Sequence, residues 1–196
     1  MSITDTTPVI KGAGFWIRAL ARILDTAYGY VLGTIAGVVG AIALLILQGL
    51  SIAEQGWQAQ ISQGKWLLIL VSFAGTICYH TLCEGLSGAS LGKLLCGLRV
   101  LSEDCSPCGF KQALTRSAAY FIDALFFGLI GYLEMTKTLM EQRHGDHWAK
   151  TVVVRSSQVP EASRRSGPRF FLAIALGSAV WSFLLAVTVI GLGLTA

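Results

Sequence analysis

The stretch AYGYVLGTIAGVVGAIALLILQGL, residues Ala27 to Leu50, decides the fold class, because it contains no charged side chain. A helix needs about 20 apolar residues to cross a bilayer, so this stretch predicts a transmembrane helix. The composition of the whole chain agrees: 54% of its 196 residues are hydrophobic and only 13% are charged. Soluble proteins carry about 25% charged residues. The sequence therefore predicts an integral membrane protein and excludes a disordered chain or a disulfide-stapled secreted one.

Two further stretches predict additional spans. Trp66 to Cys83 contains no charge apart from His80, and Phe170 to Ala196 contains none. A fourth apolar stretch, Ser117 to Leu133, is shorter and carries Asp123 near its middle. At that length a full span competes with a re-entrant or interfacial helical pair.

The positions of the cations favour the helical pair. Lys and Arg collect on the cytoplasmic side of membrane proteins. If the fourth stretch enters the membrane and returns, all of the 15 Lys and Arg residues except Lys65 lie on one side. If it crosses fully, the cations divide almost equally between the two sides. The first arrangement places the N-terminus in the cytoplasm and the C-terminus outside.

Two short β-strands are predicted at residues 97–101 and 151–154, where apolar and β-branched residues follow turn signals. They flank the fourth stretch, so they can pair only if both lie on the same side of the membrane. We therefore expect an all-α integral membrane protein with three transmembrane helices, a re-entrant or interfacial helical pair and a short two-stranded cytoplasmic element. Four spans are the alternative.

Three sequence blocks resemble the RDD family of polytopic membrane proteins. They are FWIRALARILD at residues 15–25, SLGK with GLRV at residues 90–100, and DHWAKTVVV at residues 146–154. The resemblance assigns Arg18 and Asp25 to the Arg and the first Asp for which the family is named, with Asp123 and Asp146 as candidates for the second. The closing motif usually has a His where this chain has Gly145.

The resemblance sets the expected domains and location. An RDD-type domain covers residues 1–155, a basic cytoplasmic linker covers 156–169, and an additional transmembrane helix covers 170–196. The resemblance implies a multi-pass protein of the bacterial inner (cytoplasmic) membrane. Cation–proton exchange has been proposed for some members of the family.

Arg18, Asp25, Asp123 and Asp146 are the candidate ion-coupling or ion-pair residues. Ionisable groups at membrane depth cost free energy and usually face protein or a water-filled cavity. One hypothesis is a carboxylate that exchanges a proton for a cation, with Arg18 tuning its pKa. The other is a structural ion pair that ties the first helix to the Asp123 stretch. His80 and Glu84, one helical turn apart, either extend a proton path or mark the point where the second helix leaves the bilayer.

Gly29, Gly33 and Gly37 form a small-residue repeat that predicts close packing against another helix of this chain or of a second copy.

Cys105 with Cys108 and His144 with His147 could supply a two-Cys, two-His zinc site. Their spacing is not that of a zinc finger, so we favour an exposed thiol pair and expect no metal. A disulfide is disfavoured because these loops are expected in a reducing compartment.

No catalytic motif is present, so we expect no enzyme activity and no cofactor. The leading hypothesis is a small monovalent cation/proton exchanger, and the alternative is a non-catalytic membrane scaffold or assembly partner. The expected partners are the lipid bilayer, monovalent cations and protons, and a second copy of the chain or another membrane protein, with no nucleic acid.

Overall fold

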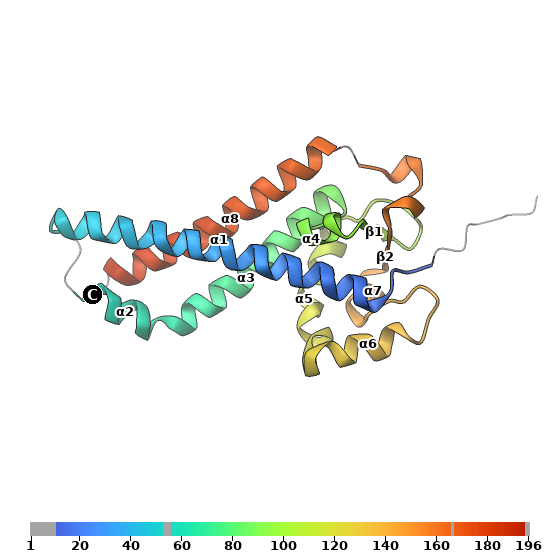
Figure 1. Cartoon of the computed structure of the whole chain (residues 1–196), viewed down its shortest axis with the longest axis horizontal. Coiled ribbons are helices and arrows are strands. Elements are labelled where there is room, and N and C mark those ends of the chain that lie inside the picture. Colours follow the sequence, from blue (N-terminus) through green and yellow to red (C-terminus); the bar gives the residue numbers. More distant parts are fainter. Residues whose placement is uncertain (1–10, 53–55, 166, 195–196) are drawn as a thin grey trace, which may run out of the picture.

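The computed structural model describes residues 11–52, 56–165 and 167–194, apart from the side chain of Phe127. Three helices in this part of the chain are long and apolar enough to cross a membrane. They are α1 (Phe15–Gly49), α3 (Lys65–Ser87) and α8 (Gly167–Leu194). In Figure 1 they form an elongated bundle with the end of α8 toward one extremity and the start of α1 toward the other. The three predicted spans are confirmed as helices.

Helix α1 begins at Phe15, well before the predicted start at Ala27. The prediction counted only uncharged residues, whereas the first turns of the helix carry Arg18 and Asp25 on its buried face. At about 1.5 Å per residue the helix is longer than the hydrocarbon core is thick. Its first turns therefore extend into the part of the molecule that holds the sheet. The predicted third span extended to Ala196, and its last two residues lie outside the described ones.

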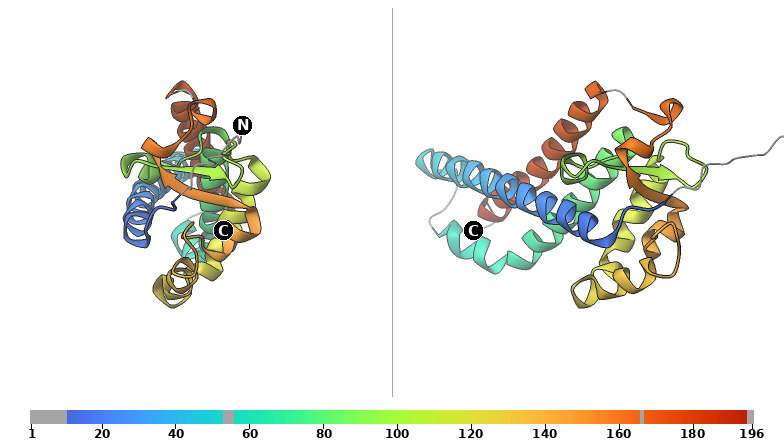
Figure 2. Two further views of the ribbon diagram at one scale, coloured as in Figure 1. Left: turned by 90° about the vertical axis from the view of Figure 1, so that its right-hand side faces the viewer. Right: turned by 45° about the vertical axis from the view of Figure 1, so that its right-hand side comes forward.

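Short elements form the end of the molecule near the start of α1 (Figures 1 and 2). In chain order they are α4 (Leu91–Leu95), β1 (Leu98–Ser102), α5 (Phe110–Asp123), η1 (Leu125–Gly128), α6 (Leu129–Met135), α7 (His144–Ala149), β2 (Thr151–Arg155), η2 (Ser156–Gln158) and η3 (Glu161–Ser163). A further helix, α2 (Trp57–Gln63), lies at the opposite end, where Trp57 packs among Leu44 and Val189.

Strands β1 and β2 pair antiparallel, with Val100 opposite Val153. This confirms the predicted two-stranded element. Side chains on both faces of the sheet are buried, because one cluster packs around Val100 and Val153 and another around Leu101 and Val152. Since the two strands are hydrogen-bonded neighbours, the chain between them starts and ends at the same end of the molecule.

Helix α8 packs against α1 and α3 through pairs of small and large residues. The indole of Trp181 lies against Gly29 of α1 and Gly75 of α3, and a Cβ added at either glycine would overlap it. Gly33 lies in ordinary contact with Leu185, whose Cδ1 is 3.8 Å from an added Cβ. At Gly37 no atom lies within 4 Å of that position. The partner of the glycine repeat is thus a helix of the same chain at Gly29 and Gly33, and Gly37 makes no such contact.

Candidate functional site

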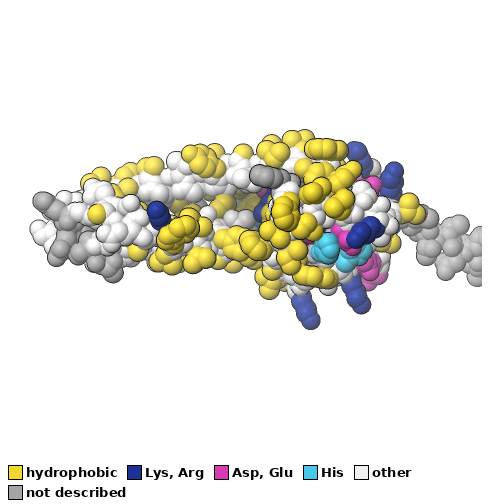
Figure 3. Space-filling view, turned by 90° about the horizontal axis from the view of Figure 1, so that it is seen from below, with side chains coloured by type: hydrophobic (Ala, Val, Ile, Leu, Met, Phe, Trp, Pro, Cys, Tyr) yellow, Lys and Arg dark blue, Asp and Glu magenta, His cyan; other side chains and the backbone are white. Residues whose placement is uncertain are grey.

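Ionisable side chains converge where α1, α3, α5 and α7 meet. Figure 3 shows charged side chains gathered at one end of the molecule and apolar side chains over the long helices. We define the charge cluster as Arg18, Arg22, Asp25, His80, Glu84, Lys93, Arg116, Asp123, Arg143 and Asp146. Most of these side chains are buried.

Asp146 is the centre of the charge cluster and is 1% exposed. Its Oδ2 accepts hydrogen bonds from Nη1 and Nη2 of Arg18, both at 2.9 Å, and its Oδ1 lies 2.9 Å from Nη1 of Arg116. Burial alone would raise the pKa of Asp146, but Arg116, Arg18 and Arg143 together hold it well below its usual range. Asp146 is therefore ionised and fixed between two guanidinium groups.

Of the three candidate carboxylates, Arg18 thus pairs with Asp146 and not with the Asp123 stretch. Arg18 contacts neither Asp25 nor Asp123. Its partner is the carboxylate of Asp146, which belongs to the last of the three sequence blocks that resemble the RDD family. Arg18 and Asp25 share a helical face, yet seven residues separate them by about 10.5 Å along the axis. That separation is too large for a direct pair, so Arg18 reaches sideways to α7 instead.

Glu84 is the second paired carboxylate. It forms ion pairs with Lys93 and with Nε of Arg116, the latter at 3.0 Å, and Arg116 also donates to Oγ1 of Thr151 at 2.9 Å. Glu84 and His80 are 3% and 4% exposed and lie near the end of α3 at Ser87, so they face the interior of the protein there. Burial lowers the pKa of Lys93, and Glu84 partly offsets this shift.

From the sequence, Arg116 and Arg143 are only orienting cations, and Lys93 is an orienting cation that also belongs to the SLGK block. Arg116 directly precedes an apolar stretch, which is where orienting cations also occur, so its position alone did not reveal its role. The signal that could have identified these cations is that Glu84 of α3 and Asp146 of α7, once buried, each need a cationic partner.

Asp25 differs from these carboxylates because its close donors are uncharged. Oδ2 accepts a hydrogen bond from the Ser90 hydroxyl at 2.6 Å, and Oδ1 accepts one from the Gly92 amide at 2.7 Å. A Cβ at Gly92 would overlap the carbonyl of Ala21, so only glycine lets α4 approach α1 this closely. Within the described chain, no ion pair to Asp25 occurs.

Asp123, the remaining carboxylate, caps the start of α7. It accepts hydrogen bonds from the amides of His144 and Gly145 at 3.2 and 3.3 Å, and Nδ1 of His144 lies 3.3 Å away. A Cβ at Gly145 would lie 3.0 Å from Cβ of Ala119, so the glycine at this position allows α7 to pack tightly on α5.

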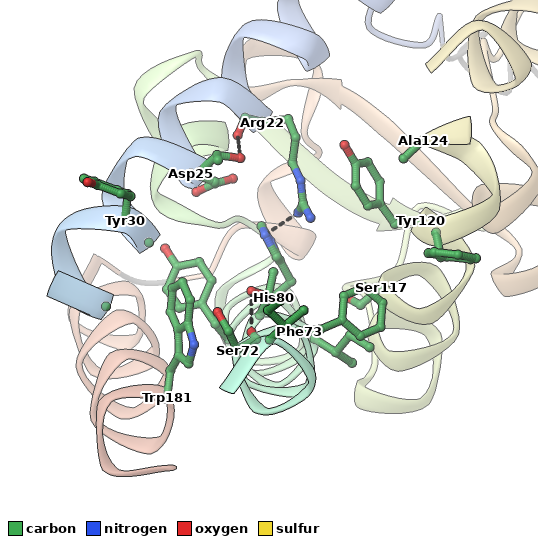
Figure 4. A pocket seen from close by; sticks show the side chains of 18 of the residues that line it. Arg22, Asp25, Tyr30, Ser72, Phe73, His80, Ser117, Tyr120, Ala124 and Trp181 are labelled. Atoms are coloured by element: carbon green, nitrogen blue, oxygen red, sulfur yellow. Dashed lines mark hydrogen bonds between the residues drawn. The ribbon is translucent and has the colours of Figure 1, made fainter. Parts of the chain in front are cut away.

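Two cavities meet at Asp25. A groove of about 750 Å³ lies between α1, α3 and α5, and a small polar cavity of about 40 Å³ lies inside the charge cluster. Asp25, Arg22 and His80 line both. Figure 4 shows Arg22 pointing to His80, with the Tyr120 ring beside its guanidinium group. The Arg22 Cζ lies 3.8 Å from the centroid of that ring.

The proposed zinc ligands are not brought together. In residues 11–52, 56–165 and 167–194, no group of three or more His, Cys, Asp or Glu side chains is placed to hold a metal ion. All five cysteines are free thiols, and burial raises the pKa of Cys108 to about 11. Cys108 is fully buried, which contradicts the expected exposed thiol pair. His144 and His147 lie near Glu134 instead, at 3.6 and 3.9 Å.

A comparison with known families identifies the chain, since the model described as the RDD family matches residues 12–150. The chain belongs to the RDD family. No curated protein and no solved structure matches it. The RDD match contains every member of the charge cluster, whereas α8 lies beyond it. The cluster is therefore part of the RDD region, and Trp181 packs against that region from outside the match.

Proposed function

We propose that this RDD membrane protein is a small monovalent cation/proton exchanger in which Asp25 is the exchange carboxylate. The observation that supports this assignment is the contrast in hydrogen-bond partners within the charge cluster. Asp146 and Glu84 are each paired with two cationic side chains, while Asp25 accepts only from a hydroxyl and an amide. A carboxylate fixed by two cations is poorly suited to alternate between a proton and a metal cation.

The position of Asp25 also supports exchange. It lies on a membrane-spanning helix, where an ionisable residue commonly marks an ion pathway. It lines both the groove and the small polar cavity, although its side chain is buried. The Ser90 hydroxyl can donate to the ionised carboxylate or accept from the protonated one, which allows both states without a backbone change.

The test uses purified protein in vesicles with a trapped pH-sensitive dye and an imposed proton gradient. Addition of Na⁺, Li⁺ or K⁺ is expected to move protons in wild-type vesicles. Asp25→Asn should abolish this movement because an amide cannot titrate. Asp104→Asn, which changes an exposed carboxylate, is the matched control and should behave as wild type. Wild-type protein that moves no proton with any of the three cations would overturn the proposal.

We also propose that the segment from α5 to α6 dips into the membrane from the cytoplasmic side and returns. Apolar side chains at its tip are exposed, with Phe121 at 61% and Phe126 at 75%. Exposed aromatic rings of this size are expected to face lipid or a partner. The paired strands and the cation distribution support a cytoplasmic N-terminus in a bacterial inner membrane.

Accessibility in intact cells tests this orientation. In a variant whose native cysteines are replaced, Lys65→Cys should react with an impermeant thiol reagent, and Lys137→Cys should not. A permeant reagent should label both sites and serves as the control. Labelling of Lys137→Cys by the impermeant reagent would contradict the orientation.

A non-enzymatic scaffold or assembly partner is the second candidate, favoured by the outward position of Gly37. Since this glycine makes no close contact with another helix among the described residues, it is available to a helix of a second copy. Gly37→Leu should then reduce the mass of the purified complex, whereas Gly191→Leu, at another uncrowded glycine, should not. A monomeric wild-type protein would exclude a homo-oligomer.

A further inference from the structure

The charges around the small polar cavity do not balance. Five cationic side chains and two carboxylates line it. The cations are Arg18, Arg22, Lys93, Arg116 and Arg143, and the carboxylates are Asp25 and Glu84. A third carboxylate, Asp146, lies outside the lining and pairs with Arg18 and Arg116. Two positive charges are therefore in excess, in a site that is largely shielded from solvent. Uncompensated buried charge is costly, so this excess points to an anion.

The two surplus charges can be assigned. Arg18, Lys93 and Arg116 each form an ion pair of 3.0 Å or less with Glu84 or Asp146. Arg22 forms none in the described residues, and its nitrogen donates to His80 Nε2. Arg143 approaches only Asp146, at 3.8 Å from its Nε, and that Nε has no hydrogen-bond partner.

Arg22 and Arg143 also lie close to each other in the fold, because both guanidinium groups lie over the ring of Tyr120. The distances from Cζ to the ring centroid are 3.8 Å for Arg22 and 5.6 Å for Arg143. Two arginines around one aromatic ring present several N–H donors to the same region. Guanidinium donors of this kind suit the oxygens of a phosphate group.

The groove that Arg22 lines is mainly apolar and runs along α1 and α3. The groove of about 750 Å³ is walled by side chains such as Ile69 and Phe73 of α3. A second groove, of about 860 Å³, lies between α1 and the α5–α6 segment. Arg22 lines both grooves, and Arg143 lines the second. Residues that line both grooves include Thr26, Tyr30 and Tyr120. The two grooves are thus neighbouring parts of one apolar face along α1.

Two polar atoms of the first groove have no hydrogen-bond partner in the part of the chain that the structure describes. Ser117 Oγ and Trp181 Nε1 are buried without a hydrogen bond, and both residues line the groove. Figure 4 shows Ser117 near the Arg22–Tyr120 end of the groove and Trp181 at the opposite side. Buried polar atoms are normally hydrogen-bonded, so the Ser117 hydroxyl is a further donor available to a ligand at the arginine end.

We propose that an anionic phospholipid binds here, with its phosphate between Arg22 and Arg143 and its acyl chains along the apolar grooves beside α1. The charge surplus selects a headgroup with net negative charge, and the long apolar walls select a lipid rather than a soluble phosphate. This proposal goes beyond cation exchange and does not depend on it. The bound phosphate would also offset the positive potential that Arg22 projects toward Asp25, which favours a cation near that carboxylate.

The test measures lipid binding rather than ion flux, so its outcome is independent of the exchange assay. Purified full-length protein in detergent is titrated with phosphatidylglycerol, phosphatidylcholine or inorganic phosphate, and bound molecules are counted by native mass spectrometry. Wild-type protein is expected to bind one phosphatidylglycerol at least tenfold more tightly than phosphatidylcholine. Equal affinity for the two lipids, or binding of inorganic phosphate as tight as that of phosphatidylglycerol, would overturn the proposal.

Variants locate the site. Arg22→Gln and Arg143→Gln should each weaken phosphatidylglycerol binding about tenfold, as expected for loss of a charge-assisted hydrogen bond. Arg22→Lys, which keeps the charge, should retain part of the affinity and provides a folded variant if Arg22→Gln is unstable. Arg155→Gln removes an exposed cation and is the matched control. Wild-type affinity in both Arg22→Gln and Arg143→Gln would show that the lipid binds elsewhere.

Discussion

Trp181 on α8 is enclosed by two glycines, Gly29 and Gly75, whereas Asp146 on α7 is enclosed by two arginines, Arg18 and Arg116. In both regions a side chain from late in the chain inserts against α1 and one further helix. Between membrane helices, lipid offers no hydrophobic driving force, so close packing of small against large residues supplies the stability. At the charged end, Asp146 and Glu84 can be buried because each of them meets two cationic side chains.

Helix α1 joins two regions that are stabilised in different ways. Arg18 and Gly29 lie about 16 Å apart along the helix. At such separations the effects of substitutions on the free energy of unfolding usually add. Changes in one region should therefore leave the other region intact.

The largest expected effect is on the charged end, from Arg116→Met. This change removes a cation from both Glu84 and Asp146 and leaves buried carboxylates undercompensated. The free energy of unfolding should fall by about 3–5 kcal/mol, measured by denaturant unfolding in detergent. Arg155→Met, at an exposed position on the sheet, is the control and should change little. A loss below about 1 kcal/mol in Arg116→Met would show that the cluster does not stabilise the fold.

A smaller effect is expected at the tryptophan, from Gly75→Ala. The new methyl group overlaps the indole of Trp181, and overpacking of this kind costs about 1–3 kcal/mol. The second change Trp181→Phe should recover part of the loss, because it removes the overlapping ring. Gly37→Ala is the matched control: it meets open space, and the higher helix propensity of alanine should leave stability equal or slightly increased. Equal losses at Gly75 and Gly37 would contradict the packing account.

The smallest expected effect concerns pH. The pKa of Asp146 in the folded protein is held below its unfolded value of about 3.9. Its stabilisation is therefore complete above that value and is lost as the pH falls through the lower, folded-state pKa. Between pH 8 and pH 5 the difference in midpoint temperature between wild type and Asp146→Asn should stay constant. It should shrink below about pH 4. A difference that shrinks already between pH 8 and pH 5 would contradict the ionised, paired state.

The sequence predicts the spans well, because an uncharged apolar run as long as Ala27–Leu50 is typical of a transmembrane helix. It also predicts the two strands to within a residue or so, since they stand beside clear turn signals. The sequence does not predict the start of α1 correctly. Charged residues such as Arg18 and Asp25 indicate the limit of the apolar stretch, whereas both are buried inside the protein.

For the charge cluster, the sequence identifies most of the residues but not their pairing. Arg18 meets Asp146 across 128 positions of the chain, and no local spacing encodes that contact. The same limit applies to Trp181, which is one apolar residue among many in α8. Its enclosure by Gly29 and Gly75 depends on how three helices cross, and only the fold determines that.

The most direct test compares two carboxylates, Asp25 and Asp146, in the same pair of assays. Asp25→Asn should unfold within about 1 kcal/mol of wild type, since Ser90 and Gly92 can still bond the amide side chain, and it should abolish cation-dependent proton movement in vesicles. Asp146→Asn should lose about 3–5 kcal/mol, because two buried arginines lose their shared anion. Comparable destabilisation by both changes, or proton movement that survives in Asp25→Asn, would contradict the division between a paired structural carboxylate and an unpaired exchange carboxylate.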